Sequence, residues 1–195
     1  MMLSMHVRHV DQLTESIDRL DREVLREIDP VVEQVRLLCT ITGIGQRTAE
    51  VVIAEIGVDM TRFPTANHLA SWAGLCPGNH ESAGKRRSGK ARKGDAALRV
   101  ALCEAAWSAA KTRDTYLGAQ FRRFSRRTGK KNEGNAIFAV AHTMVVIIWH
   151  LLANNVAYDE LGGDYFDRRD ASVEIRRHVA ALQRLGQNVT INPAA

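Results

Sequence analysis

Residues 7–29 alternate apolar and charged positions with the period of a helix. The apolar residues recur at the three-then-four spacing of a coiled-coil seam, with Asp, Glu and Arg between them: Val10, Leu13, Ile17, Leu20 and Val24. Pro30 breaks or kinks this helix, because proline lacks the backbone N–H that a helix interior uses. We therefore predict an amphipathic helix that either packs on its own domain or pairs with a second copy of the chain.

Helical periodicity continues along the chain, interrupted by turns that contain glycine or proline. An apolar turn at Gly43–Gly45 leads into a helix whose inward side carries Ala49, Val52, Ile53 and Ile56. Further helices are predicted at residues 67–74, 96–111, 116–127, 136–153 and 171–185. Residues 78–95 are polar and basic, so we expect a loop there. Since no segment alternates as a strand does, the predicted fold class is all-α.

These elements group into three regions. We expect a coiled-coil-like helix over residues 1–34, a helical domain with basic loops over 35–153, and an acidic linker with a carboxy-terminal helix over 154–195. The expected contacts of that last helix are Val173, Val179, Leu182 and Leu185. Three tryptophans are expected in the core and two glutamates on polar helix faces: Trp72, Trp107, Trp149, Glu50 and Glu55.

The most apolar stretch, residues 136–153, has the length of a short membrane span. It carries His142 and His150, and no second span accompanies it. We interpret it as the buried central helix of a soluble domain, with both histidines hydrogen-bonded in the core.

Composition fits a globular protein with one substantial domain. The 195 residues are 45% hydrophobic and 25% charged, which argues against wholesale disorder. Cys39, Cys76 and Cys103 form neither a CxxC pair nor an even disulfide set, and the amino terminus lacks a signal-peptide core. Neither the cysteines nor the histidines have zinc-like spacing. We expect a cytoplasmic protein with no membrane partner and no metal site.

Positive charge is concentrated in two segments. Residues 85–93 (KRRSGKARK) hold six basic residues in nine, and residues 122–131 (RRFSRRTGKK) hold six in ten. The other 15 of the 27 Lys and Arg residues face 22 Asp and Glu residues, so the rest of the chain is acidic. A charged run is usually a solvated surface, but two such segments beside one helix favour binding of nucleic-acid phosphates.

The turn at Gly43-Ile44-Gly45 adds a second indication of nucleic-acid binding. An apolar residue between two glycines, joining two helices, resembles the helix-hairpin-helix, in which backbone N–H groups approach a DNA phosphate at a helix N-terminus. A plain glycine-rich turn between helices has the same appearance.

Several motifs stand in order along the chain. They are Gly43–Gly45 (GIG), Phe63–Ala66 (FPTA), Leu69–Pro77 (LASWAGLCP), Ser82–Lys85 (SAGK), Lys93–Asp95 (KGD), Leu98-Arg99 and Gly162–Phe166 (GGDYF). Over residues 7–190 the chain resembles the carboxy-terminal half of the DEDD insertion-sequence transposases, the family of the pilin-gene invertase and the RNA-guided bridge recombinases. It departs from the family at Asp95, where Asn is commoner, and slightly at Lys131–Asn135.

The resemblance implies that Ser82 is a nucleophile on a DNA phosphodiester and forms a phosphoserine intermediate. A serine hydroxyl needs activation and a stabilised transition-state charge, and the cations after Ser82 fit that need. Ser82 as a mere phosphate-binding loop serine, Ser88 as the nucleophile and His80 as a base stay open. The expected DNA-binding residues are Gly43, Ile44, Gly45, Lys85, Arg86, Arg87, Lys90, Arg92, Lys93 and Arg99.

The resemblance also implies partners. In the family, an amino-terminal RuvC-like domain carries four acidic residues that bind Mg²⁺; we find no such segment in these residues and expect this chain to bind no cofactor itself. We expect it to bind DNA, to self-associate through its amino-terminal helix, and to be incomplete for recombination alone. A guide RNA is left open as a partner. The alternative is a non-catalytic helix-hairpin-helix module for DNA binding or dimerisation.

Overall fold

The computed structural model describes residues 2–191 except 79, 83–84, 89–90, 92 and 129–132, with backbone only at 80–82, 85–88, 128 and 173–174. Most of this part is helical, which confirms the all-α class, and it includes one two-stranded hairpin. The elements are α1 (Met2–Ile28), η1 (Asp29–Val31), α2 (Val32–Cys39), α3 (Gln46–Ile56), η2 (Met60–Arg62), α4 (Ala66–Trp72), β1 (His80–Ser82), β2 (Lys85–Ser88), α5 (Ala96–Lys111), α6 (Tyr116–Thr128), α7 (Glu133–Asn154), α8 (Tyr165–Arg169) and α9 (Ala171–Arg184).

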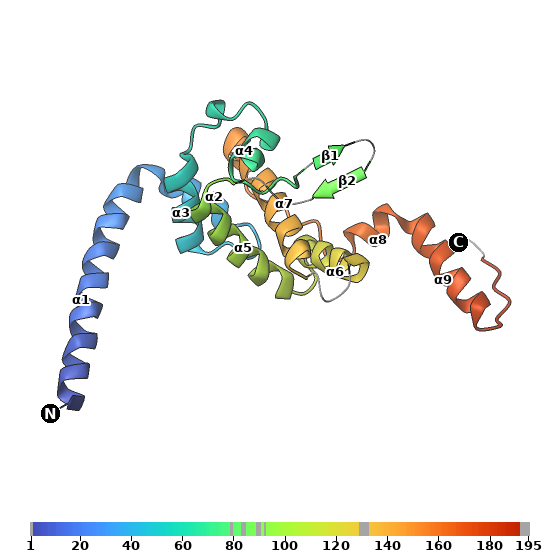
Figure 1. Ribbon diagram of the computed structural model, residues 1–195, viewed down its shortest axis with the longest axis horizontal. Helices are drawn as coiled ribbons and strands as arrows, with labels where there is room; N and C mark the ends of the chain where they lie inside the picture. The colour runs from blue at the N-terminus through green and yellow to red at the C-terminus, as the bar shows by residue number, and fades with distance from the viewer. Residues whose placement is uncertain are drawn as a thin grey trace.

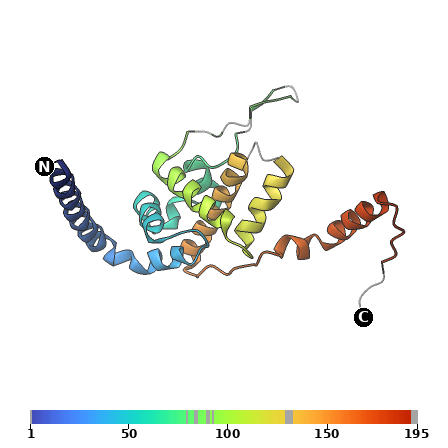
Figure 2. The ribbon, with the colours of Figure 1, turned by 90° about the horizontal axis from the view of Figure 1, so that it is seen from below.

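Helix α7 lies at the centre of a helical body and packs against α2, α4, α5 and α6 (Figures 1 and 2). Its buried side chains include Ile137, Val140, Met144 and Ile148. Within the described residues, α7 is the one helix long and apolar enough to cross a membrane by length and composition. Since these apolar side chains pack on neighbouring helices, the interpretation of α7 as the buried central helix is confirmed.

Helices α2 and α3 form a pair that packs on α5 and α7. The predicted inward side of α3 is confirmed, because Ala49, Val52, Ile53 and Ile56 are all buried. The turn between the two helices passes very close to α5. Gly43 there has a φ of +93°, and a Cβ atom at this position would lie 2.5 Å from the carbonyl oxygen of Ala105. A side chain fits neither this backbone conformation nor this space.

Helix α1 projects from the body, and α9 lies on the opposite side (Figure 1). The predicted amino-terminal helix is confirmed, and it begins earlier, at Met2. None of its residues is buried, and its seam residue Leu20 is 65% exposed. Pro30 lies in the 3₁₀ turn η1, which separates α1 from α2. An ion pair between Asp21 and Arg47 of α3 connects the last turns of α1 to the body.

The segment before α8 crosses the body and is held by polar contacts. The Glu160 carboxylate accepts hydrogen bonds from the Tyr116 backbone N–H (2.7 Å) and from the Thr42 hydroxyl (3.0 Å). The rings of Tyr165 and Phe166 then pack on Tyr116 at 5.1 and 5.3 Å between centroids. The GGDYF motif thereby positions α8 against the start of α6.

Residues 78–95 are not the uniform loop that their composition predicts. Residues 80–82 pair with residues 85–88 as two antiparallel strands instead. Strand pairing uses backbone groups, so a hairpin that extends from the body needs no apolar–polar alternation to form.

Three predictions about which side chains are buried are also wrong. Trp72 and Trp107 are 42% and 41% exposed, and Glu50 is buried, where it accepts hydrogen bonds from Gln46 and Arg47. Trp149 is half-buried and donates from Nε1 to the Phe63 carbonyl oxygen at 2.9 Å. Short side chains such as Ala105 and Ala109 bring the helices so close that large rings are displaced to the edges of the core.

Two further expectations about apolar and polar contacts fail. Near the end of α9, Leu182 and Leu185 are exposed, whereas Val179 is half-buried and the side chain of Val173 lies outside the described residues. His150 is exposed, and the buried Nδ1 of His142 has no hydrogen-bond partner among the described residues.

Candidate nucleic-acid interface

The β1–β2 hairpin carries the first basic segment away from the helical body (Figures 1 and 2). Its register pairs Ser82 with Lys85 and Glu81 with Arg86, with an irregularity between His80 and Glu81. The backbone of the candidate serine therefore lies directly opposite that of the first cation of the segment.

Both ends of the hairpin segment are held at the junction of α4 and α5. The Asp95 backbone N–H donates to the Trp72 carbonyl oxygen at 3.3 Å, and a Cβ atom at Gly94 would collide with the Gly74 backbone. The Asp95 carboxylate accepts from the Leu98 N–H at 2.7 Å and so caps α5. Asn is an equally good cap, so the departure from the family at Asp95 leaves this junction unaltered.

The predicted site residues of this segment are only partly visible. Six of them are described by their backbones, which belong to the two strands: His80, Ser82, Lys85, Arg86, Arg87 and Ser88. Lys90 and Arg92 lie outside the described residues. Lys93 is exposed, and Arg99 is half-buried in the first turns of α5. The structure thus brings Lys93 and Arg99 to the base of the hairpin, and the roles of the strand side chains stay predictions.

The Gly43–Gly45 turn separates into an inner and an outer part. Gly43 packs against α5 and Ile44 is 5% exposed, so both have packing roles. Gly45 is exposed at the N-cap of α3, with open space where a Cβ would stand. Of the three predicted contacts, Gly45 is the exposed one, and it lies beside the first N–H groups of α3, which have no intrahelical acceptor. The helix-hairpin-helix role stays a prediction.

The four arginines of the second basic segment lie on the exposed side of α6. With residues of α8 and α9 they line a concave surface of about 510 Å³, which we call the arginine pocket. Its cationic lining residues are Arg122, Arg123, Arg126, Arg127 and Arg177. Sequence reasoning missed Arg177 and the adjoining Phe166, because their proximity to α6 depends on the path of the linker between α7 and α8.

Ion pairs and cation–π contacts order the edge of the arginine pocket. Arg123 pairs with Asp170 at 2.8 Å, and the guanidiniums of Arg123 and Arg169 lie 5.2 and 5.3 Å from the centre of the Phe166 ring. The hydrogen-bonded Arg169, with Arg123 beside it, lowers the pKa of the Asp170 carboxyl. Opposite charges thus connect α6 to Asp170, the residue between α8 and α9.

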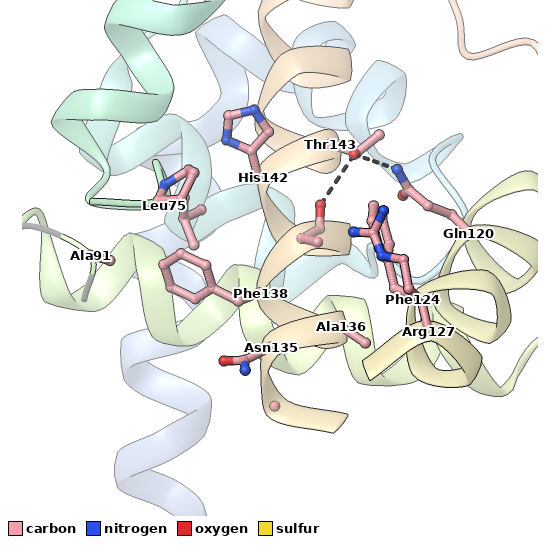
Figure 3. Close-up of a pocket in the computed structure, with 13 residues that line it drawn as sticks. Leu75, Ala91, Gln120, Phe124, Arg127, Asn135, Ala136, Phe138, His142 and Thr143 are labelled. Carbon is pink, nitrogen blue, oxygen red and sulfur yellow. Dashed lines mark hydrogen bonds between the residues drawn. The ribbon is translucent and has the colours of Figure 1, made fainter. Parts of the chain in front are cut away.

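A second cavity, of about 790 Å³, lies between α6 and α7 at the base of the hairpin (Figure 3). We call it the Gln120 cavity. The two basic segments meet here, because Ala91 from the first and Arg127 from the second both line it. The sequence did indicate this cavity through three polar residues on otherwise apolar helix faces: Gln120, His142 and Thr143. Their significance was not predicted from the sequence.

Among the residues that the structure describes, no three His, Cys, Asp or Glu side chains gather as metal ligands would.

The fold and its surface define a helical domain with a protruding basic hairpin, and comparison with known proteins gives this domain a context. Residues 35–122 match the family described as "Transposase IS116/IS110/IS902 family". This range is just under half of the chain and contains the Gly43–Gly45 turn, the hairpin and α5.

Curated relatives agree with this match. The chain is 39% identical over 80 residues to the pilin gene-inverting proteins of Moraxella bovis and Moraxella lacunata, which covers 40% of this chain and 24% of each relative. It is 31% identical over 128 residues to an insertion element IS110 uncharacterized 43.6 kDa protein of Streptomyces coelicolor, which covers 63% of this chain and 30% of the relative. The matched part of the chain spans less than a third of these relatives. Together the comparisons support the resemblance to transposases and DNA-inverting proteins.

Proposed function

We propose that this chain is the DNA-binding, serine-bearing domain of an insertion-sequence transposase, which cleaves and rejoins DNA strands. The observation that carries the proposal is the hairpin within the matched range 35–122. Its register pairs the backbone of Ser82 with that of Lys85, the first residue of the basic segment 85–93, which holds six cations in nine residues. The matches to pilin gene-inverting proteins support the same class of reaction.

In the proposed reaction, the Ser82 hydroxyl oxygen attacks the phosphorus of a DNA phosphodiester. The bond between phosphorus and one deoxyribose oxygen breaks, and the serine proton passes to that leaving oxygen, directly or through a base. One DNA end is then joined to Ser82 as a phosphodiester and the other ends in a hydroxyl. Attack by a DNA hydroxyl reverses these steps and frees the serine. Lys85, Arg86 and Arg87 would stabilise the charge that develops on the phosphoryl oxygens.

Covalent trapping tests this proposal. Labelled element-end DNA is incubated with the chain, a RuvC-like domain of the family, Mg²⁺ and a guide RNA, then separated on a denaturing gel. We expect a protein–DNA adduct with the wild type and with Ser88→Ala, and none with Ser82→Ala. A full-length relative active under the same conditions is the positive control.

The same experiment decides between the proposal and a non-catalytic module. If Ser82→Ala and the wild type bind DNA equally and neither forms an adduct beside the active control, the chain is a binding module without this chemistry. An adduct lost in Ser88→Ala but kept in Ser82→Ala would move the nucleophile to Ser88.

We also propose that α1 pairs with α1 of a second copy. Its seam residues Val10, Leu13, Ile17 and Leu20 are at least 50% exposed, and no residue of α1 is buried against the body. An apolar seam at this spacing is what a two-stranded coiled coil buries. Sedimentation should give a dimer that Ile17→Asp converts to a monomer, while Glu15→Gln leaves it unchanged; a monomeric wild type would contradict the pairing.

A further inference from the structure

The Gln120 cavity extends across α7, with residues of α6 on one side of this helix and Leu75 and Ala91 on the other (Figure 3). From α6 come Gln120, Phe124 and Arg127, and from α7 come Asn135, Phe138 and His142. Spacings of three, four and seven residues put each set on one side of its helix. The result is an apolar and aromatic space with a few polar atoms, as in sites for small planar ligands.

The amide of Gln120 gives this cavity a hydrogen-bond acceptor. Its Nε2 donates to the Thr143 hydroxyl oxygen at 2.8 Å, and Thr143 uses its own proton on the Ala139 carbonyl oxygen at 3.2 Å (Figure 3). Thr143 can therefore only accept from Gln120, which fixes the amide orientation and leaves Oε1 as the second amide atom. Gln120 is 9% exposed, and its Oε1 has no hydrogen-bond partner within the described chain.

A buried acceptor without a donor is costly, so it indicates a ligand that supplies one. His142 adds a second unpartnered polar atom, because its Nδ1 is buried in the wall of the same cavity and has no partner among the described residues. Two unsatisfied polar atoms and two phenylalanine rings in one cavity fit a flat ring system that carries hydrogen-bonding groups, with at least one N–H, on its edge.

Arg127 connects this cavity to the arginine pocket, since it lines both. Its guanidinium lies 5.0 Å from the centre of the Phe124 ring, and its side chain is exposed. A ligand that extends from one cavity to the other would place a planar group near Gln120 and negative charge along Arg122, Arg126 and Arg127.

We propose that the Gln120 cavity takes one unpaired nucleobase of a nucleic-acid strand whose phosphates lie along the α6 arginines. The inference rests on the proposed function, because it takes the strand to be the nucleic acid that this domain handles. A base inside a duplex is stacked and paired, so only an unpaired or extruded base can enter a cavity between helices. Every nucleobase carries an N–H donor on its pairing edge for Oε1 of Gln120, and phenylalanine rings stack on any base.

The test compares two short single strands of equal charge, one fully abasic and one abasic except for a central adenine. Fluorescence anisotropy gives the dissociation constants, with deoxyribose and ribose backbones as separate arms to distinguish DNA from RNA. We expect the wild type to bind the strand with adenine about tenfold more tightly, which is the size of effect that stacking of one base gives.

Two variants test the cavity itself. Ala139→Leu fills it from α7, and Gln120→Leu removes the acceptor; both should abolish the preference for adenine. Ala153→Leu, at the exposed end of the same helix, is the matched control and should keep it. Arg127→Gln should weaken both strands alike. Circular dichroism confirms that each variant folds.

The outcomes separate this inference from the proposed function. Equal binding of both strands by the wild type, with duplex DNA binding intact, overturns the base-binding role alone, as does a preference that survives in Ala139→Leu. Absence of binding to any nucleic acid overturns both proposals. Binding of an apolar peptide with no preference for adenine would assign the cavity to a protein segment instead.

Discussion

The two basic segments have nearly the same composition, yet one contributes a strand and the other a helix. The first, residues 85–93, contributes β2 to a hairpin that extends from the body, whereas the arginines of the second lie in the last turns of α6. On α6, Arg123 is ion-paired with Asp170 and Arg127 lies on Phe124, so the protein already orders part of this charge. The number of cations in a segment therefore predicts that it binds phosphates. Whether the segment extends from the body or lines a pocket depends on its secondary structure.

The largest effect on DNA binding is expected when the positive charges of the hairpin are removed. The triple variant Lys85→Gln, Arg86→Gln, Arg87→Gln should make the dependence of log affinity on log salt shallower by about 2.7 for duplex DNA, since each contacted phosphate contributes about 0.9. Arg8→Gln, Arg19→Gln, Arg22→Gln on the exposed face of α1 is the control with equal charge change. An unchanged slope in the hairpin variant would remove the hairpin from the DNA interface.

The next largest effect comes from the junction that holds the hairpin. Gly94→Ala places a methyl group against the Gly74 backbone, which must move. We expect a loss of about 1–3 kcal/mol in the free energy of unfolding, measured by chemical denaturation, because overpacking in a close-packed site costs this much. Gly45→Ala, where a Cβ meets open space, is the control and should cost far less. A loss for Gly94→Ala no larger than that for Gly45→Ala would show that the junction tolerates displacement.

A smaller effect is expected on α6. Arg126→Gln removes one cation of the arginine pocket and should lower the salt dependence of single-strand binding by about 0.7, the contribution of one phosphate. Arg113→Gln, exposed between α5 and α6, is the control. A larger loss on duplex than on single-stranded DNA would reverse the roles of the two basic segments.

The smallest effect concerns the acidic edge of the arginine pocket. The pKa of Asp170 is lowered by Arg169 and Arg123, so its ionised form favours the folded state above the ordinary carboxyl pKa, and that contribution disappears as the pH falls through the lowered value. Below about pH 4, amides of α8 and α9 should exchange hydrogen faster while those of α7 stay protected. Asp170→Asn should show the same fast exchange at neutral pH, and a pH-independent pattern would contradict this account.

The helices were predictable because local periodicity and capping determine them. Helix α5 spans the predicted residues 96–111, and the inward positions of α3 were identified correctly. The tryptophans were misplaced because exposure depends on how closely neighbouring helices approach. That distance is set by the alanines of α5 and by Gly43, whose contact with Ala105 connects residues far apart in the sequence.

The candidate site was predictable in composition and not in shape. Both basic segments were evident, yet neither the register that pairs Ser82 with Lys85 nor the cavity that joins Ala91 to Arg127 follows from local sequence. The cavity joins residues far apart in the sequence, so it arises from tertiary packing, which overrides local preference. Gln120 and His142 were visible as polar residues on apolar helices, and only the assembled helices show that both face one cavity.

The close approach of Gly94 to Gly74 has an evolutionary consequence. The chain passes the same point of the body at Gly74 and again at Gly94, so the helices do not determine the length of the strands β1 and β2 that extend between these two glycines. Doubling the length of such a connection costs only about 0.6 kcal/mol of chain entropy. Under the proposed function, related proteins could therefore lengthen, shorten or exchange this hairpin, and so change their preferred nucleic-acid target, while the helices of the domain stay the same.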